Sequence, residues 1–412
     1  MEAATGKKDL SQEIKEAFQL RGFENSSVRK NALDQFLNKG LPGSKTEEYK
    51  FTPITRTLEK IFTTRASAGS EVQTLKVPDL KCNVIAFVNG VFSEKHSSIV
   101  DLDLALTYPS VANATSTDPF SLLNDAFAEG EVTLTMGAGK RLQHPIAIIH
   151  HFTAGGFIFA NPRWSLNLGK NAEVSLFELT SCEPGAIYFN NKQSFTTVGE
   201  NAGLEYSVIQ NNAGEIQLNN STITLSNASR AACFTFTFDG QLVRNNLTLC
   251  VDGQGADAHL YGLYLLSKNT IADNHTVVDH RQPNSSSNEL YKGVMEGNSK
   301  GVFNGKIYVR PDAQKTNAFQ SNRNLLLSEA ATINTKPQLE IWADDVKCSH
   351  GCTTGQLDEE ALFYLRSRGI PKEQARGMML SAFATEALAS LKNDFVKDLV
   401  SDIIAGKLHH GA

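Results

Sequence analysis

Hydrophobic residues in the first 60 positions recur every three or four residues, which is the spacing of one face of an α-helix. Two such stripes, at residues 10–18 and 28–37, predict two helices, and a Gly- and Pro-containing run at 40–43 predicts the end of the second. An Asn-Gly pair at 89–90 lies between two short apolar runs and predicts a β-hairpin. A further apolar stripe at 119–128 predicts another helix.

From about residue 131 the pattern changes to short strands, in which apolar and polar residues alternate or apolar residues come in pairs. Small turns rich in Asn, Gly and Ser separate these runs, and no stretch long enough for an ordinary helix interrupts them. Strands are expected at residues 132–136, 146–149, 174–179, 204–209, 233–238, 247–251 and 259–266, with the last at 338–342.

The turns between these strands also repeat. The segments Leu168-Gly-Lys-Asn-Ala-Glu-Val174 and Val198-Gly-Glu-Asn-Ala-Gly-Leu204 match position for position, 30 residues apart. A repeat of this length indicates stacked units that bury their faces only against their neighbours. Because the units contain only strands, a parallel β-helix is the first expectation, and a β-sandwich remains the alternative.

Three amphipathic stripes in residues 358–406 predict three C-terminal helices. Asp358 is placed to cap the first helix, Gly369 to close it, and Pro371 to open the second. These helices either cover the open end of the strand array or form a docking platform for a partner. The pattern leaves both possibilities open.

Composition narrows the class of protein. The chain has 412 residues and a net charge of −5, from 39 Lys and Arg against 44 Asp and Glu, and this mild acidity argues against a general nucleic-acid binder. No apolar stretch approaches the roughly 18 residues of a membrane-spanning helix, and the first ten residues lack the apolar core of a signal peptide. Six cysteines are too few for a disulfide scaffold. We therefore expect a cytoplasmic protein that binds neither nucleic acid nor membrane.

The sequence motifs that resemble enzyme active sites are incomplete in this chain. The segment Gly137-Ala-Gly-Lys140 resembles part of a phosphate-binding loop, but the required first glycine and the Ser or Thr after the lysine are missing. Asp344 and Asp345 are adjacent and would point to opposite faces of a strand, so they cannot act together as acid and base. The chain is therefore not expected to be an enzyme.

One segment, Lys347-Cys-Ser-His-Gly-Cys-Thr353, carries candidate metal ligands. Cys348, His350 and Cys352 alternate along it, so in an extended backbone all three would project from one face. Thiolate and imidazole suit zinc and iron–sulfur units, but three ligands do not complete a tetrahedral site. The segment therefore predicts an open site that a partner completes, or a turn, bent at Gly351, that holds inert thiols.

This segment lies within a stretch, residues 334–370, that closely resembles the C-terminal motif of the SufB/SufD family of iron–sulfur cluster assembly proteins. The motifs that carry the resemblance elsewhere are at residues 45–50, 279–283, 291–294, 303–307, 313–316 and 324–328. SufB members carry a cysteine and a histidine shortly before the last Gln-x-Glu strand, and residues 327–335 contain neither. The chain is therefore identified with the SufD branch of the family.

The resemblance implies a mainly β fold, with a right-handed parallel β-helix core at residues 131–355. A helical N-terminal domain with a short hairpin (residues 1–130) and a helical C-terminal domain (residues 356–412) would flank this core. It also implies a non-catalytic scaffold of the Suf complex, which pairs with SufB through the β-helix and binds the ATPase SufC at its C-terminal helices. SufC would then hydrolyse the ATP.

For the site, the resemblance implies that His350 and the adjacent thiol of Cys348 take part in forming a cluster at the SufB interface. Cys352 occupies a position where a small residue is common in the family, so its role stays open. No cofactor would be held stably by this chain alone, and the cluster would be transient and shared with SufB. The sequence does not say whether the chain itself holds a cluster or flavin, or whether it forms a homodimer in isolation.

Two other functions remain as alternatives. A purely structural partner of SufB would have the same fold and leave His350 without a ligand role. A β-helix carbohydrate-active enzyme should show an export signal and clustered acids or arginines along one stack of strands, and the sequence shows neither.

Overall fold

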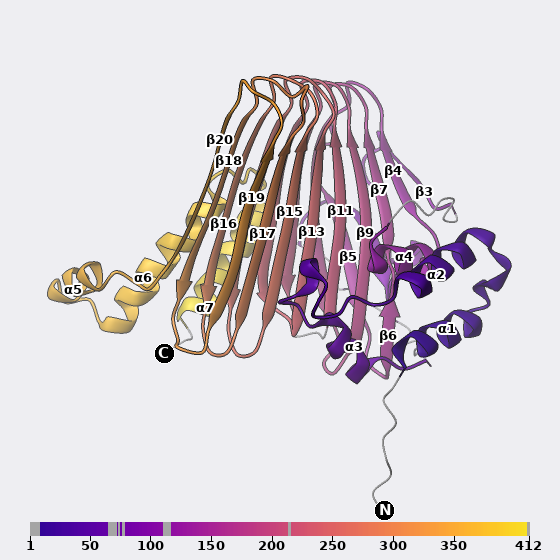
Figure 1. The fold of residues 1–412 in the computed structure, drawn as a ribbon, viewed down its shortest axis with the longest axis horizontal. Helices are drawn as coiled ribbons and strands as arrows, with labels where there is room; N and C mark the ends of the chain where they lie inside the picture. The colour runs from indigo at the N-terminus through magenta and orange to yellow at the C-terminus, as the bar shows by residue number, and fades with distance from the viewer. Residues whose placement is uncertain are drawn as a thin grey trace, which may run out of the picture.

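The computed structural model describes residues 9–64, 72, 75, 79–109, 117–212 and 216–409. The first eight residues, on which part of the cytoplasmic expectation rests, lie outside these ranges. The fold is a β-solenoid of about eight turns with helices near both ends of the chain (Figure 1). With 44% of residues in strands and 24% in helices, the protein is mainly β, as predicted.

The solenoid has two long sheets, each with ten strands. In the first, the strands follow the order β2 (Val91–Phe92), β1 (Asn83–Val88), β5 (Ile146–Phe152), β8 (Glu173–Cys182), β10 (Gly203–Asn211), β12 (Arg230–Asp239), β14 (Asp257–Leu266), β16 (Ser286–Met295), β18 (Asn317–Leu326) and β20 (Lys347–Gly355). In the second, the order is β19 (Thr332–Ile341), β17 (Lys300–Val309), β15 (Ile271–His280), β13 (Leu242–Val251), β11 (Ile216–Leu225), β9 (Ile187–Val198), β7 (Arg163–Leu168), β4 (Val132–Met136) and β3 (Leu104–Thr107), and β6 (Phe157–Ala160) pairs with β9 beside β7.

Successive strands from β8 to β20 alternate between the two sheets, so each strand pairs with one that lies a full coil away in sequence. Leu204, for example, pairs with Val174 on one side and with Ala231 on the other. The pairs β1–β2 and β3–β4 are antiparallel, and the other pairs between these strands are parallel. The parallel β-helix prediction is therefore confirmed, and the β-sandwich alternative is wrong.

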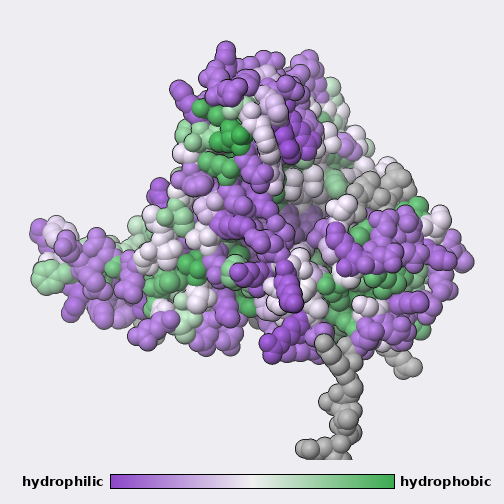
Figure 2. All heavy atoms as spheres, viewed as in Figure 1, coloured by the Kyte–Doolittle hydropathy of each residue, from purple (hydrophilic) through white to green (hydrophobic). Residues whose placement is uncertain are grey.

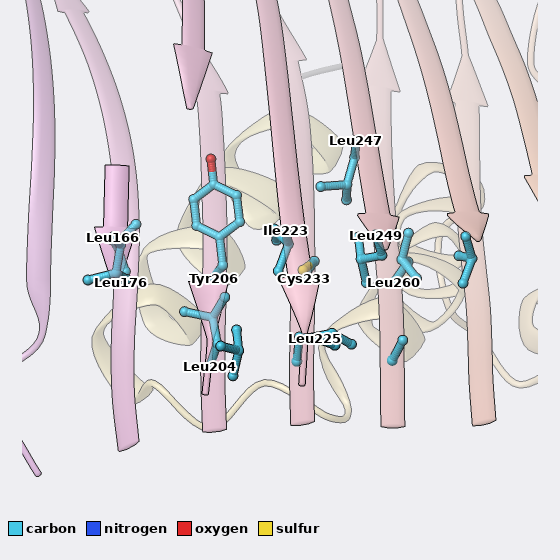
Figure 3. Close-up of a cluster of buried hydrophobic side chains, with 14 of the residues drawn as sticks. Leu166, Leu176, Leu204, Tyr206, Ile223, Leu225, Cys233, Leu247, Leu249 and Leu260 are labelled. Atoms are coloured by element: carbon cyan, nitrogen blue, oxygen red, sulfur yellow. The ribbon is translucent and has the colours of Figure 1, made fainter. Parts of the chain in front are cut away.

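The core lies between the two sheets. Four successive strands of the first sheet carry buried side chains at equivalent positions: Leu176, Tyr206, Cys233 and Leu260. Figure 3 shows them beside leucine and isoleucine side chains of the second sheet. Each residue in such a row is buried by the row of the next coil. This is why no single coil needs a long apolar run of its own.

The repeated turns have a common backbone geometry. Asn171, Asn201, Ala228, Asn284 and Lys315 have φ between +54° and +60°, the left-handed region. Asn adopts this region more readily than most residues, which explains the Asn-Ala sequence of the first two turns. The N–H of each of these five residues donates to a carbonyl of the next coil, so the turns stack as the strands do.

The N-terminal helices cover part of the second sheet. These helices are α1 (Leu10–Leu20), α2 (Ser27–Lys39), α3 (Ile54–Ile61) and α4 (Pro119–Phe127), with short 3₁₀ turns at Phe23–Asn25 and Glu47–Tyr49. Phe120 packs against Phe189 of β9, and buried Arg244 of β13 lies over the ring of Tyr49. The predicted helices at 10–18, 28–37 and 119–128 are therefore confirmed.

The C-terminal helices are α5 (Glu359–Ser367), α6 (Lys372–Thr385) and α7 (Asp394–His409), with a 3₁₀ turn at Glu386–Leu388. Leu380 of α6 and Val400 of α7 belong to an apolar cluster on the outer face of the first sheet. The Asp358 side chain accepts hydrogen bonds from the first backbone amides of α5, as expected of its cap. All three predicted helices are present, and no helix in the described ranges could span a membrane.

Two features differ from the sequence-based expectation. The hairpin at Asn89-Gly90 forms, followed by a 3₁₀ turn at Glu94–His96, but its first strand also pairs with β5, so the N-terminal segment contributes to the solenoid. The strand expected to be last, at 338–342, corresponds to β19 and is followed by one more strand, β20. β20 was missed because it lies at the edge of the sheet, where its solvent-exposed residues carry no apolar alternation.

Candidate functional site

The three candidate ligands lie on β20, the last strand of the first sheet. β20 pairs with β18 along one edge, and no strand of the described residues pairs with its other edge. Cys348, His350 and Cys352 stand opposite Ala318, Gln320 and Asn322 of β18, which are buried in the interior.

The backbone of the candidate site is extended throughout. Lys347–Gly355 is a continuous strand, so the turn bent at Gly351 is wrong, and the common face expected for the three ligands is present. This face is the inner one, because Cys348 packs against the interior apolar cluster. Among the described residues no further coil covers that face beyond β20, and every residue of the strand except Cys348 is exposed.

The three side chains form a row and do not converge. Alternate residues of a strand are about 6.6 Å apart, so Cys348, His350 and Cys352 cannot all reach one metal ion. No group of three or more His, Cys, Asp or Glu residues in the described ranges could hold a metal ion. The row can therefore contribute one or two ligands, which is fewer than a complete metal site has.

The two thiols differ in environment. Cys348 is half-buried, and burial raises the pKa of its thiol, partly offset by a backbone hydrogen bond from Ala318. Its proton must therefore leave when a soft metal binds. Cys352 is exposed, and its Sγ lies 3.3 Å from Oγ1 of Thr335 and 3.9 Å from Oδ1 of Asn322.

A buried polar pair lies in the interior behind His350. Gln320 of β18 and Glu289 of β16 precede His350 in the same inward-facing row, and Gln320 Nε2 donates to Glu289 Oε2 at 2.6 Å. Burial raises the pKa of Glu289 to about 7, although the hydrogen bond from Gln320 opposes the shift. Sequence analysis missed this pair, because the coil register that aligns the three residues is not visible without the pairing of the strands.

A second exposed surface lies on the C-terminal helices. Phe363 and Tyr364 of α5 are 71% and 57% exposed, and Met378 of α6 is 45% exposed. Figure 1 shows α5 projecting away from the solenoid, and Figure 2 shows hydrophobic residues at the surface around these helices. Exposed aromatic side chains on a projecting helix are typical of a protein-binding surface.

Comparison with known proteins matches most of the chain to two family models. Residues 151–383 match the SUF system FeS cluster assembly SufBD core domain, and residues 23–148 match the SufBD protein N-terminal region. The chain is 29% identical to the iron–sulfur cluster assembly protein SufD of Escherichia coli, over 96% of each chain. It is 30% identical to an iron–sulfur cluster assembly SufBD family protein of Synechocystis, over 92% of this chain and 90% of the relative.

Proposed function

The chain belongs to the SufBD family of iron–sulfur cluster assembly proteins, and we propose that it is a non-catalytic scaffold subunit of a cytoplasmic Suf complex. In this proposal it pairs with SufB, docks the ATPase SufC, and shares with SufB the site where a cluster is built. The cluster is the cargo of this site and leaves it for other proteins.

The observation that carries the proposal is the open end of the solenoid. β19 and β20 end the two sheets, and neither has a strand partner on its outer edge among the described residues. An unpaired edge offers backbone N–H and C=O groups to a strand of another chain. SufB, pairing there, would cover this edge and stand next to Cys348 and His350.

The incomplete ligand row fits such a shared site. His350 can donate a lone pair to iron when its imidazole is neutral, and the thiol of Cys348 can do so after losing its proton. The residues of β20 are too far apart for all three to bind one metal ion. A cysteine from SufB would supply a further ligand. The site would therefore exist only in the assembled complex.

We expect His350→Ala to lower cluster formation by at least ~10-fold, because losing a ligand should cost no less than losing a residue that supports one. The variant is co-expressed with SufB and SufC, the complex is purified anaerobically, and its iron and sulfide are measured. His259→Ala is the matched control, since His259 lies on the outer face of β14, far from β20 along the sheet. A His350→Ala complex with normal iron and sulfide would favour the purely structural role.

The exposed surface of α5 and α6 supports the docking of SufC. We expect Phe363→Ser to reduce recovery of SufC with the complex by about tenfold or more, because an exposed aromatic anchor can contribute 2 kcal/mol or more to an interface. SufB recovery should not change. Leu20→Ser is the matched control, since Leu20 of α1 is similarly exposed, at 68%. Equal recovery of SufC by both variants would place its docking elsewhere.

A further inference from the structure

The inward-facing row that ends at His350 changes character along the solenoid. In its earlier coils the row is mostly apolar, as at Cys233 and Leu260, and in its last three coils it consists of Glu289, Gln320 and His350. Polar side chains in a protein interior lower stability unless they are paired. Three in succession, ending at a candidate ligand, therefore need a physical explanation.

The hydrogen bonds of the first two residues leave two buried acceptors unused among the described residues, Oε1 of Glu289 and Oε1 of Gln320. Gln320 is 3% exposed and Glu289 is 1% exposed, and the Nε2 of Gln320 donates to the carboxylate of Glu289. The other end of the amide, Oε1 of Gln320, is buried and has no hydrogen-bond partner among the described residues. A buried acceptor without a partner lowers the stability of the fold, so a donor is expected beside it.

The opposite sheet leaves room for this amide. Gly305 of β17 faces the interior, and a Cβ added to it would lie 2.1 Å from Nε2 of Gln320. Its backbone is that of an ordinary strand, so space and not backbone conformation requires glycine here. The glycine thus keeps the Gln320 side chain extended along the interior.

The register supplies the missing donor. His350 is the direct neighbour of Gln320 on β20, and paired residues of adjacent strands are about 4.8 Å apart with side chains on the same face. A neutral imidazole has one N–H donor and one nitrogen with a free lone pair.

We infer that Gln320 is a positioning residue for His350: its Oε1 accepts the ring N–H of His350 while its Nε2 stays bound to Glu289. This hydrogen bond selects one tautomer and leaves the other ring nitrogen free. That free nitrogen is the one that can bind iron at the open end of the solenoid. The role of the free nitrogen in binding iron rests on the proposed function, whereas the hydrogen bond between Gln320 and His350 does not.

The test uses the full chain labelled with ¹⁵N-histidine, with the resonances of His350 assigned by their loss in His350→Gln. At about pH 8 the wild-type ring should show two well-separated nitrogen shifts, those of one fixed tautomer. In Gln320→Met, a nearly volume-conserving change, the two shifts should move toward a common average. In the SufB–SufC complex, iron and sulfide content should fall about tenfold.

Asn322→Met is the matched control, because Asn322 is a buried amide of the same strand that bonds Tyr264 and Tyr291 and faces Cys352. It should leave the His350 shifts unchanged. If Gln320→Met does not fold, Gly305→Ala decides the question, since the added Cβ should displace the amide and average the shifts in the same way.

Unchanged His350 shifts in the variant that folds would overturn the inference. That result would leave the proposed function standing if His350→Ala still lowers the iron and sulfide of the complex. Conversely, averaged shifts together with a normal cluster content in His350→Ala would contradict the proposed function and leave the hydrogen bond established.

Discussion

Replacing Lys192 with methionine is expected to lower the free energy of unfolding by about 3–5 kcal/mol. Lys192 of β9 lies inside the solenoid, where its ammonium group binds Glu178 of β8 and lies 3.2 Å from the hydroxyl of Tyr206. The two charged side chains are 1% and 2% exposed. Without the lysine, the carboxylate of Glu178 would stay buried with only neutral or weakly basic groups around it.

The protonation of Glu178 shows how much depends on this contact. Burial raises the pKa of Glu178, but the attraction of Lys192 and the hydrogen bond from His150 outweigh it and hold the pKa at about 2. In Lys192→Met the pKa should rise, because burial remains and the main opposing charge is lost. The difference in free energy of unfolding between the wild type and Lys192→Met should therefore shrink as the pH falls, since Glu178 of the variant then takes up a proton.

Urea unfolding at neutral pH measures the effect, with Lys170→Met as the control. Lys170 also pairs with a glutamate, Glu200, at 2.8 Å, but these side chains are 55% and 53% exposed. An exposed pair contributes about 1 kcal/mol or less. The double variant Lys192→Met/Glu178→Gln should recover much of the stability, because no charge is then left unpaired. Equal losses in the two lysine variants would mean that water reaches Lys192.

The sequence was sufficient to predict the type of fold, because the features that define it are local. The turns recur from coil to coil, since each coil places a residue in the left-handed region at the same corner, and the first two share the sequence Asn-Ala. The apolar strands between them were also visible. Together these two signals favoured a stacked array over a β-sandwich, and the pairing of the strands then excluded the sandwich.

Strands with polar interiors could not be located in this way. Asn274 of β15, a strand that the pattern did not reveal, faces the interior, where its Oδ1 accepts a hydrogen bond from the amide of Asn245 in the previous coil, at 3.0 Å. Amide hydrogen bonds of this kind between coils let β11 and β15 bury polar residues without a regular apolar alternation. The strands become recognisable only after their register is known.

The candidate site shows the same division between local and long-range information. The alternation of Cys348, His350 and Cys352 is local, and it predicted their common face correctly. The relation of His350 to Gln320 spans 30 residues and to Glu289 spans 61, and it follows only from the register of β16, β18 and β20. In this chain the side chains behind His350 are more distant from it in sequence than the other two candidate ligands are.

Replacing Glu289 with glutamine is expected to change the pH dependence of stability by about 3 kcal/mol, which is the shift from a pKa near 4.5 to about 7 converted at 1.36 kcal/mol per unit. Because burial raises the pKa of Glu289, the folded state favours its protonated form. The resulting stabilisation is fully present below about pH 4.5 and is lost as the pH rises through about 7. Glutamine cannot ionise, so Glu289→Gln should lose less stability on going from about pH 5 to about pH 8.

Unfolding in urea at these two pH values, for the wild type and for Glu289→Gln, gives the difference directly. His280 acts in the opposite direction, because burial lowers its pKa to about 4 and its contribution is lost as the pH falls. That contribution is common to both proteins and cancels in the comparison. At about pH 8 the variant should be the more stable of the two. An identical pH dependence in both proteins would show that Glu289 is ionised in the fold across this range, and that the interior behind His350 is open to water.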